Sequence, residues 1–348
     1  MSETPPGVDL DRLQPWFAAN VEGAGDAPLH ASLISGGRSN LTYAIGDDTH
    51  EWVLRRPPLG HVLPTAHDMK REYTVLSALT GSAVPVPRTL AFCADEAVND
   101  APFYVMELVD GAILRTPHEM AQLSDADARR CSEALVDVLV GIHSVDYHAA
   151  GLDDFGHPDG YLERQVRRWG EQWERSKSDD VPAIEELARR LRAALPASPP
   201  PTIVHGDYRL DNTMLAPDDP GRIVAVLDWE MATLGDPLSD VGLFLVYWGR
   251  DQTDLGGDPT DGPGAGFLSR DEIVQRYADG SGLDVSQLDF YEMLASYKLA
   301  IILEGIHARY RMGKTVGEGF SHIGTMVESI ASAALERGSR SSIPALRG

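Results

Sequence analysis

The hydrophobic pattern of this chain changes its period near Gly111, and this change restricts the fold more than any other feature. Before Gly111, apolar residues form short runs separated by turn residues such as Gly46-Asp47-Asp48, which predicts antiparallel strands with one helix over residues 65–80. After Gly111, apolar residues recur at helical spacing in several longer segments, which include residues 124–142, 160–175, 182–195, 287–311 and 319–337. We therefore expect an α+β, bilobal fold with a small N-terminal antiparallel β lobe and a larger, mainly helical C-terminal lobe.

The predicted elements divide the chain into three parts. Residues 1–28 form an N-terminal helical extension, with a helix over residues 8–20 that Pro15 interrupts early. Residues 29–107 form the N-terminal lobe, and residues 108–340 form the C-terminal lobe. Two lobes joined by a short strand leave a cleft between them, and small ligands bind preferentially in such clefts.

The charge of the chain narrows the range of its partners. Asp and Glu number 53 and Lys and Arg number 30 in 348 residues, so the formal net charge is −23. Clustered cations are needed to bind a polyanion, so this balance argues against nucleic acid and against an anionic membrane surface. It is compatible with a cationic small substrate, and equally with acidity that only keeps the protein soluble.

Other features are typical of a globular cytoplasmic protein. The two cysteines, Cys93 and Cys131, have no metal-ligand spacing and fit buried thiols in a reducing compartment. The N-terminus has no basic and apolar leader, and the longest strongly apolar stretch, Val241 to Trp248, is too short to span a bilayer. We expect a cytoplasmic monomer or homodimer that acts on a small molecule.

The most informative motif is a polar loop between two short apolar segments, Thr202–Val204 and Ile223–Leu227, which we expect to pair as a hairpin. The loop contains the sequence His205-Gly206-Asp207, and Asn212 follows five residues after Asp207. The second apolar segment leads directly to Asp228-Trp229-Glu230. The motif therefore presents an amide and three carboxylates at the ends of buried strands.

This set of side chains suits phosphoryl transfer. Such a reaction needs a carboxylate that orients the acceptor hydroxyl and takes its proton, a role we assign to Asp207. It also needs oxygen ligands for a Mg²⁺ ion that bridges the nucleotide phosphates, and Asn212 and Asp228 are the candidates. Glu230 is a further metal-ligand candidate, whereas His205 is expected to hold the loop in place.

The motif resembles that of the aminoglycoside phosphotransferase and choline kinase group, which shares the protein-kinase-like fold. Further stretches extend the resemblance over most of the chain in the same order: Ser35 to Asn40 resembles the nucleotide loop, Trp52 to Arg55 the third strand, Glu72 the helix glutamate, and Met106 to Leu108 the linker that receives adenine. More narrowly, residues 54–67, 205–212 and 226–237 resemble the kinase-like domains associated with acyl-CoA dehydrogenases.

The resemblance implies an ATP- and Mg²⁺-dependent kinase that acts on a hydroxyl group of a small molecule, with GTP as an alternative nucleotide. It implies Asp207 as the catalytic residue and Asn212, Asp228 and Glu230 as the metal ligands. The nucleotide-binding residues that it implies are Gly36, Gly37, Ser39, Asn40, Arg55, Glu72, Met106, Glu107 and Leu108.

Two questions stay open at the level of the sequence. Arg55 and Arg56 stand where protein kinases have a lysine, and we expect Arg55 to contact the phosphates and to pair with Glu72. The second question is the acceptor. Arg164, Arg168 and His307 are candidates for binding an anionic acceptor such as a hydroxyacyl-CoA, whereas the net charge suits an aminoglycoside. For the function as a whole, the alternative to a kinase is a nucleotide-binding module without catalysis.

Overall fold

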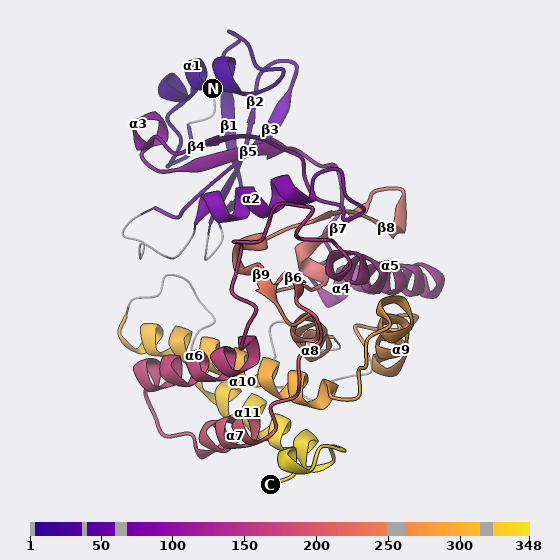
Figure 1. The fold of residues 1–348 in the computed structure, drawn as a ribbon. Coiled ribbons are helices and arrows are strands. Elements are labelled where there is room, and N and C mark those ends of the chain that lie inside the picture. The colour runs from indigo at the N-terminus through magenta and orange to yellow at the C-terminus, as the bar shows by residue number, and fades with distance from the viewer. Residues whose placement is uncertain (1–3, 37–39, 60–67, 249–261, 314–322) are drawn as a thin grey trace.

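The computed structural model describes residues 4–36, 40–59, 68–248, 262–313 and 323–348, and it has the bilobal α+β architecture expected from the sequence (Figure 1). The elements of the N-terminal lobe are α1 (Leu10–Asn20), β1 (His30–Gly36), β2 (Leu41–Gly46), β3 (Glu51–Arg56), α2 (Met69–Leu79), β4 (Thr89–Cys93), α3 (Glu96–Asn99) and β5 (Phe103–Glu107). The five strands form one antiparallel sheet in the order β1-β2-β3-β5-β4.

The sheet of the N-terminal lobe is covered on both faces, as Figure 1 shows. Helix α1 packs its buried residues Leu13 and Phe17 against the outer face, in a cluster that includes Trp52 and Leu54 of β3. Helix α2 packs on the inner face, towards the C-terminal lobe. The helix expected over residues 8–20 therefore belongs to the packing of this lobe. It also continues through Pro15, contrary to the expected interruption, because buried residues on both sides of Pro15 anchor it to the sheet.

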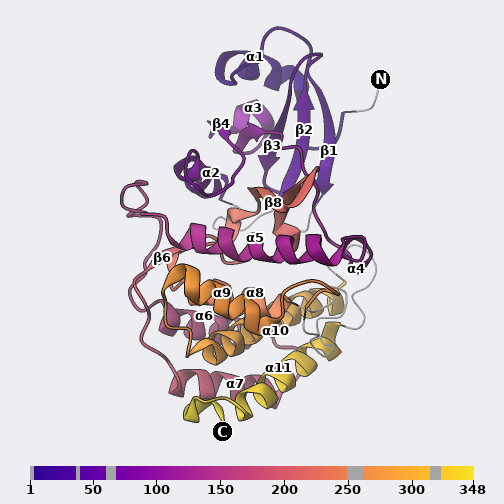
Figure 2. The same cartoon turned by 90° about the vertical axis from the view of Figure 1, so that its right-hand side faces the viewer.

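The C-terminal lobe is mainly helical. Its elements are α4 (Pro117–Met120), α5 (Asp125–His143), α6 (Tyr161–Ser176), α7 (Pro182–Ala193), β6 (Thr202–Val204), η1 (Leu210–Asn212), β7 (Thr213–Ala216), β8 (Asp219–Val226), η2 (Trp229–Met231), β9 (Thr233–Gly235), α8 (Leu238–Tyr247), α9 (Arg270–Ser281), α10 (Leu288–Arg311), α11 (Ile323–Ser339) and η3 (Pro344–Leu346). Figure 2 shows that α5 lies beneath the N-terminal lobe, with α9, α8 and α10 stacked below it.

Local capping signals place several helix starts where the sequence predicts them. The Ser124 side chain accepts a hydrogen bond from the Asp127 amide at the start of α5. Ser269 and Glu272, three residues apart in the sequence, form a capping box at the start of α9. These short-range contacts satisfy backbone N–H groups that have no partner inside the helix.

The central strands pair differently from the expected hairpin. Strand β6 pairs with β9, and β8 pairs with β7, so the segments around 202–204 and 219–226 are not partners. The cause is that the loop after Asn212 itself becomes β7, which gives β8 a nearer partner through a tight turn. Strand β6 then receives β9, which follows the 3₁₀ turn η2.

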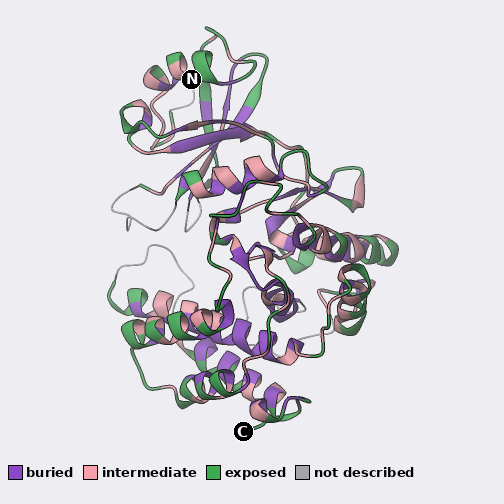
Figure 3. Ribbon diagram, viewed as in Figure 1, coloured by how far each residue is buried: buried purple, intermediate pink, exposed green. Residues whose placement is uncertain are grey.

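The hydrophobic core runs through both lobes, as the buried segments in Figure 3 indicate. Residues of the inner sheet face and of α2, such as Val53 and Leu76, belong to the same buried cluster as α5, α8 and α10. Helix α8 is buried along almost its whole length because it has apolar residues on every face. The described helices include none that is long and apolar enough to cross a membrane.

Candidate active site

The alternation of side chains along β3 decides which of the two arginines faces the interior between the lobes. Successive residues of a strand point to opposite faces of its sheet. Arg55 lies on the inner face and its Nε atom is 3.0 Å from Glu72 Oε1. Arg56 points to the outer face, where it is buried and donates hydrogen bonds to the carbonyl oxygens of Gly7 and Asn99. The expected pairing of Arg55 with Glu72 is therefore present, and Arg56 holds the N-terminal segment.

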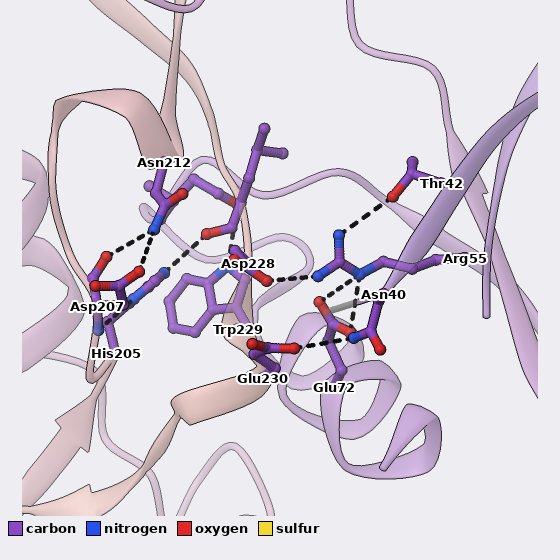
Figure 4. A network of polar contacts seen from close by, with 12 residues as sticks. Asn40, Thr42, Arg55, Glu72, His205, Asp207, Asn212, Asp228, Trp229 and Glu230 are labelled. Carbon is purple, nitrogen blue, oxygen red and sulfur yellow. Dashed lines mark hydrogen bonds and ion pairs between the residues drawn. The ribbon is translucent and has the colours of Figure 1, made fainter. Parts of the chain in front are cut away.

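Arg55 also reaches across to the C-terminal lobe (Figure 4). Its Nη2 atom lies 2.5 Å from Asp228 Oδ1, and its Nη1 atom donates to Thr42 Oγ1 at 3.3 Å. Glu72, which is 1% exposed, holds the guanidinium from behind. Burial raises the pKa of Glu72, and the charge of Arg55 opposes this shift.

Asp207 and Asn212 lie together on the loop after β6. Asn212 Nδ2 donates to the Asp207 carbonyl oxygen at 2.8 Å and to Asp207 Oδ2 at 3.0 Å. Both side-chain hydrogen bonds recorded for Asn212 among the described residues use Nδ2, which turns the amide oxygen away from Asp207. Burial raises the pKa of Asp207, whereas the charges of Arg209 and Lys298 lower it.

His205 holds this loop against β8. Its Nε2 atom is 2.9 Å from the Leu227 carbonyl oxygen, and its Nδ1 atom accepts a hydrogen bond from the Asp207 amide at 3.2 Å. The Asp207 loop and the strand end that carries Asp228 are therefore joined by one buried imidazole. Asp228 itself has a left-handed backbone (φ 64°), a conformation that costs free energy for a residue with a side chain and that is common at functional sites.

Asp240, on α8, fixes the same loop from below. Its Oδ2 atom accepts a hydrogen bond from the His205 amide at 2.7 Å, and its Oδ1 atom accepts one from the Gly206 amide at 2.8 Å. The Nε2 atom of His143, on α5, lies 3.2 Å from Asp240 Oδ2, and its Nδ1 atom lies 2.7 Å from Tyr277 Oη. The sequence around Asp240 does not reveal these contacts, because a loop 34 residues away leaves no local signal.

A cavity of about 420 Å³ lies between the inner face of the sheet and these residues. Its walls contain most of the residues that the sequence assigned to nucleotide and metal binding, namely Asn40, Arg55, Glu72, Met106, Glu107, Leu108, Asn212 and Asp228. Gly36 ends β1, where it pairs with Leu41, whereas Gly37 and Ser39 lie outside the described residues. The sequence thus predicted residues from both lobes that the fold brings to one cavity.

Glu230 is close to this site and links the two lobes. Its Oε2 atom accepts a hydrogen bond from Asn40 Nδ2 at 3.1 Å. Burial and the neighbouring Asp228 carboxylate raise the pKa of Glu230 to about 7. The carboxylates of Glu72, Asp228 and Glu230 against the single guanidinium of Arg55 leave a formal charge of −2 when all are ionised.

The donor set suits a divalent cation that is held jointly by protein and substrate. No group of three His, Cys, Asp or Glu side chains is arranged to hold a metal within the part of the chain that the structure describes. Mg²⁺ commonly uses one or two carboxylates together with phosphate oxygens rather than a cage made only of protein. Asp228 and the amide oxygen of Asn212 fit that requirement, and the excess of negative charge would be balanced by a divalent ion.

The candidates for acceptor binding are less closely associated with Asp207. The Arg164 guanidinium donates to the carbonyl oxygens of His157, Asp159 and Gly160, so it holds the turn before α6. Arg168 is exposed on α6. His307 of α10 packs against Gly324 of α11. The structure does not join these three side chains into one site.

Sequence reasoning missed a cation that does lie beside the Asp207 loop. Lys298 of α10 donates a hydrogen bond from Nζ to the Gly206 carbonyl oxygen at 2.8 Å. A signal was present, since Lys298 is one of only four lysines and stands between two apolar segments, residues 293–295 and 299–303.

Comparison with known proteins identifies the group to which this architecture belongs. The model of the family described as "Phosphotransferase enzyme family" matches residues 30–289. The chain belongs to this phosphotransferase family. It is 33% identical over 336 residues to acyl-CoA dehydrogenase family member 11 of Rattus norvegicus, a match that covers 94% of this chain and 43% of that protein. The chain thus spans less than half the length of that curated relative.

Solved structures agree with the membership in the phosphotransferase family. A Ralstonia eutropha protein that carries the provisional name aminoglycoside phosphotransferase is 31% identical, with a TM-score of 0.79 over 94% of this chain and 98% of that one. The ternary complex of aminoglycoside phosphotransferase APH(4)-Ia with AMP-PNP and hygromycin B has a TM-score of 0.61 at 14% identity, over 94% of this chain and 99% of that one. The second likeness concerns the fold alone. Together these matches confirm the family and the kinase-like fold expected from the sequence.

Proposed function

We propose that the chain is an ATP- and Mg²⁺-dependent phosphotransferase that phosphorylates a hydroxyl group of a small molecule. The observation that carries this proposal is that Asn212 and Asp228 line one cavity opposite Arg55 of the other lobe, and that Asp207 is hydrogen-bonded to Asn212 beside it. Phosphoryl transfer depends mainly on positioning and on electrostatic stabilisation, and these residues supply both functions. The family membership supports the same reaction class.

Each side chain has a defined part in the proposed reaction. Asp207 orients the acceptor hydroxyl and takes its proton as the hydroxyl oxygen attacks the γ-phosphorus. The bond between this phosphorus and the β–γ bridging oxygen breaks, and ADP leaves. Arg55, held by Glu72, binds the α- and β-phosphates. Asn212 and Asp228, with Glu230 nearby, would hold Mg²⁺, which neutralises the charge on the phosphates.

The nucleotide is expected to lie in the cavity with its base against the linker of residues 106–108. We propose ATP as the donor, with GTP as the alternative to be compared directly. The complex of a related fold with AMP-PNP is consistent with an adenine nucleotide. The Glu107 amide already donates to the Arg88 carbonyl oxygen at 2.9 Å, so donors for the base are expected at Leu108 and Val109.

For the acceptor, we propose a hydroxyacyl-CoA or another anionic hydroxy compound. The similarity to a protein named as an acyl-CoA dehydrogenase family member supports this class, since an acyl-CoA is the kind of molecule that such a name implies. The alternative is an aminoglycoside, which is supported by the net charge of −23 and by the hygromycin B complex of a related fold.

A coupled assay of ADP release tests the proposed function. The panel contains hydroxybutyryl-CoA thioesters with the hydroxyl at carbon 3 or carbon 4, the corresponding free hydroxy acids, hygromycin B and kanamycin. Asp207→Asn is expected to lower kcat by about 10³-fold or more while ATP binding persists, because the base is lost and the cavity is kept. Asp218→Asn, at an exposed ion pair with Arg222, is the matched control. Undiminished turnover in Asp207→Asn would refute the proposed role, and ATP binding without transfer would support a non-catalytic module.

A further inference from the structure

Lys298 is a cation in an unusual place beside the proposed catalytic residue. It lies in the middle of α10, flanked by the buried residues Tyr297 and Leu299, and only part of its side chain is accessible. Its ammonium group lies 2.8 Å from the carbonyl oxygen of Gly206, the residue that directly precedes Asp207. Trp169 of α6 faces it, with the ring centroid 5.9 Å from Nζ. A lysine is seldom kept in such surroundings without a partner, because burying its charge is costly.

The ammonium group has unused capacity to donate hydrogen bonds. It carries three N–H groups, and Gly206 is its one recorded hydrogen-bond acceptor among the described residues. The two acidic residues whose charges act on Lys298 already accept hydrogen bonds from other groups. Asp240 accepts hydrogen bonds from the His205 and Gly206 amides, and Asp207 accepts one from the Asn212 side chain. Burial lowers the pKa of Lys298, and the charges of Asp207 and Asp240 oppose that shift.

Four further accessible residues of α10 continue from Lys298 along one face of the helix. Residues that are 4, 7, 8 and 11 positions apart share a helix face. In α10 these positions are Ile302, Gly305, Ile306 and Arg309, and each of them is at least partly accessible whereas most of their neighbours are buried. We call this set, from Lys298 to Arg309, the α10 stripe. At 1.5 Å per residue its two cations are about 16 Å apart, with an apolar stretch between them.

The position of the α10 stripe relates it to the proposed reaction. One end lies at the Asp207 loop through Lys298, and the helix axis leads away from it alongside α6, with which α10 packs (Figure 1). Arg309, at the other end, has no recorded ion pair within the part of the chain that the structure describes, and it is exposed. An elongated molecule with an oxygen acceptor near its reacting hydroxyl and an anionic group at its far end would match this arrangement.

We propose that Lys298 is the residue that positions the acceptor, by binding the carbonyl or carboxylate oxygen next to the hydroxyl that is phosphorylated, and that the α10 stripe receives the rest of an elongated acceptor whose far end is anionic. This inference rests on the proposed function. It favours a hydroxyacyl thioester of CoA as the acceptor and disfavours an aminoglycoside, because an aminoglycoside presents ammonium groups that Lys298 and Arg309 would repel. In this arrangement Lys298 donates to the acyl oxygen while Asp207 accepts the hydroxyl proton.

The test separates binding of the acceptor from binding of the nucleotide. In the full chain, Lys298→Met is expected to raise the KM for hydroxybutyryl-CoA by roughly 10- to 100-fold, because a charged hydrogen bond is lost, with the KM for ATP changed less than twofold. Lys298→Arg should restore part of the loss. Lys70→Met, at an exposed lysine of α2, is the matched control. Arg309→Gln should raise the KM for the CoA thioester but not for the pantetheine thioester that lacks the nucleotide phosphates.

The outcomes distinguish this inference from the proposed function. If the wild type transfers phosphate and Lys298→Met keeps its acceptor KM, or loses ATP hydrolysis to the same degree as transfer, Lys298 does not position the acceptor. Calorimetry with hydroxybutyryl-CoA in the presence of AMP-PNP provides a readout without turnover. Binding by the wild type that weakens at least tenfold in Lys298→Met supports the inference even if no transfer occurs, in which case only the proposed kinase activity is wrong. No binding of hydroxybutyryl-CoA by the wild type would overturn this inference, and no transfer to any acceptor of the panel would overturn the proposed kinase activity as well.

Discussion

Replacement of Asp240 by asparagine is a sharp test of how the Asp207 loop is held. The Asp240 carboxylate is 1% exposed and accepts one backbone N–H on each oxygen, from His205 and Gly206. An asparagine can keep only one of these hydrogen bonds, because its amide nitrogen would face the second N–H group, donor against donor. Hydrogen bonds to charged groups contribute about 1.5–3 kcal/mol, and a buried N–H without a partner costs about 1–3 kcal/mol.

These magnitudes predict a loss in the free energy of unfolding of about 2–4 kcal/mol for Asp240→Asn, which corresponds to several degrees in Tm. Activity should fall further than stability alone explains. A displacement of about 1 Å at a catalytic group is worth roughly 10²-fold in rate, and Asp207 directly follows the two amides that Asp240 holds. We therefore expect kcat to fall about 100-fold, with the KM for ATP nearly unchanged because the nucleotide cavity is lined by other residues.

Asp236 provides a matched control four residues earlier in the chain. It is equally buried, but it accepts hydrogen bonds from the Leu238 amide and from Tyr291 Oη, and none is recorded from the loop of residues 205–207. Asp236→Asn should therefore lower Tm by a comparable amount and leave kcat within about threefold in the remaining folded protein. Thermal unfolding and initial rates below both transition temperatures measure the two effects. Equal losses of kcat in the two variants, or full activity in Asp240→Asn, would refute the reasoning.

Three further predictions follow from the same geometry. Glu72→Gln removes the charge behind Arg55, so the KM for ATP should rise about tenfold, and an unchanged KM would argue against Arg55 as a phosphate ligand. Gly206→Ala should reduce Tm and activity together, since Gly206 has φ 83° and an added Cβ would lie 2.7 Å from the Met231 carbonyl oxygen; a wild-type Tm would contradict this. Burial raises the pKa of Asp240, but hydrogen bonds from His143 and the Gly206 amide outweigh it and hold that pKa below its usual value. The stability that Asp240 contributes is therefore present above about pH 4 and lost below it, and the acid slope of Tm should be shallower in Asp240→Asn.

The parts of the fold that short-range patterns determine could be predicted from the sequence. Period-two alternation in β3 placed Val53 and Arg55 on one face and Arg56 on the other, as the structure has them. Capping residues such as Ser124 and Ser269 mark helix starts because their partners are three residues away. The contact between Asp207 and Asn212 is also short-range, since both residues lie on one loop and are joined by a direct hydrogen bond.

Contacts between distant segments explain what the sequence did not reveal. The pairing of β6 with β9 depends on competition between several short strands, and their composition does not decide that competition. Asp240 supports the Asp207 loop, and Lys298 reaches the same loop across 92 residues. Asp240 leaves no mark of this contact on the local pattern of its helix, and Lys298 leaves only a lysine between two apolar segments, which does not identify its partner. Arg164 is a local example, because its position four residues before Arg168 does not reveal that its guanidinium donates to the nearby carbonyl oxygens.

The proposed metal ligands also connect the two lobes, and this dual use has a consequence for nucleotide binding. Arg55 of the N-terminal lobe pairs with Asp228, and Asn40 pairs with Glu230. In the proposed function, a nucleotide that brings Mg²⁺ would offer phosphates to Arg55 and a divalent cation to Asp228. Binding would therefore exchange an ion pair between the lobes for two interactions with the same ligand, and charge would be compensated on both sides. The lobes would then be held together through the nucleotide instead of directly, so that the cavity closes on the donor with little net cost in unpaired charge.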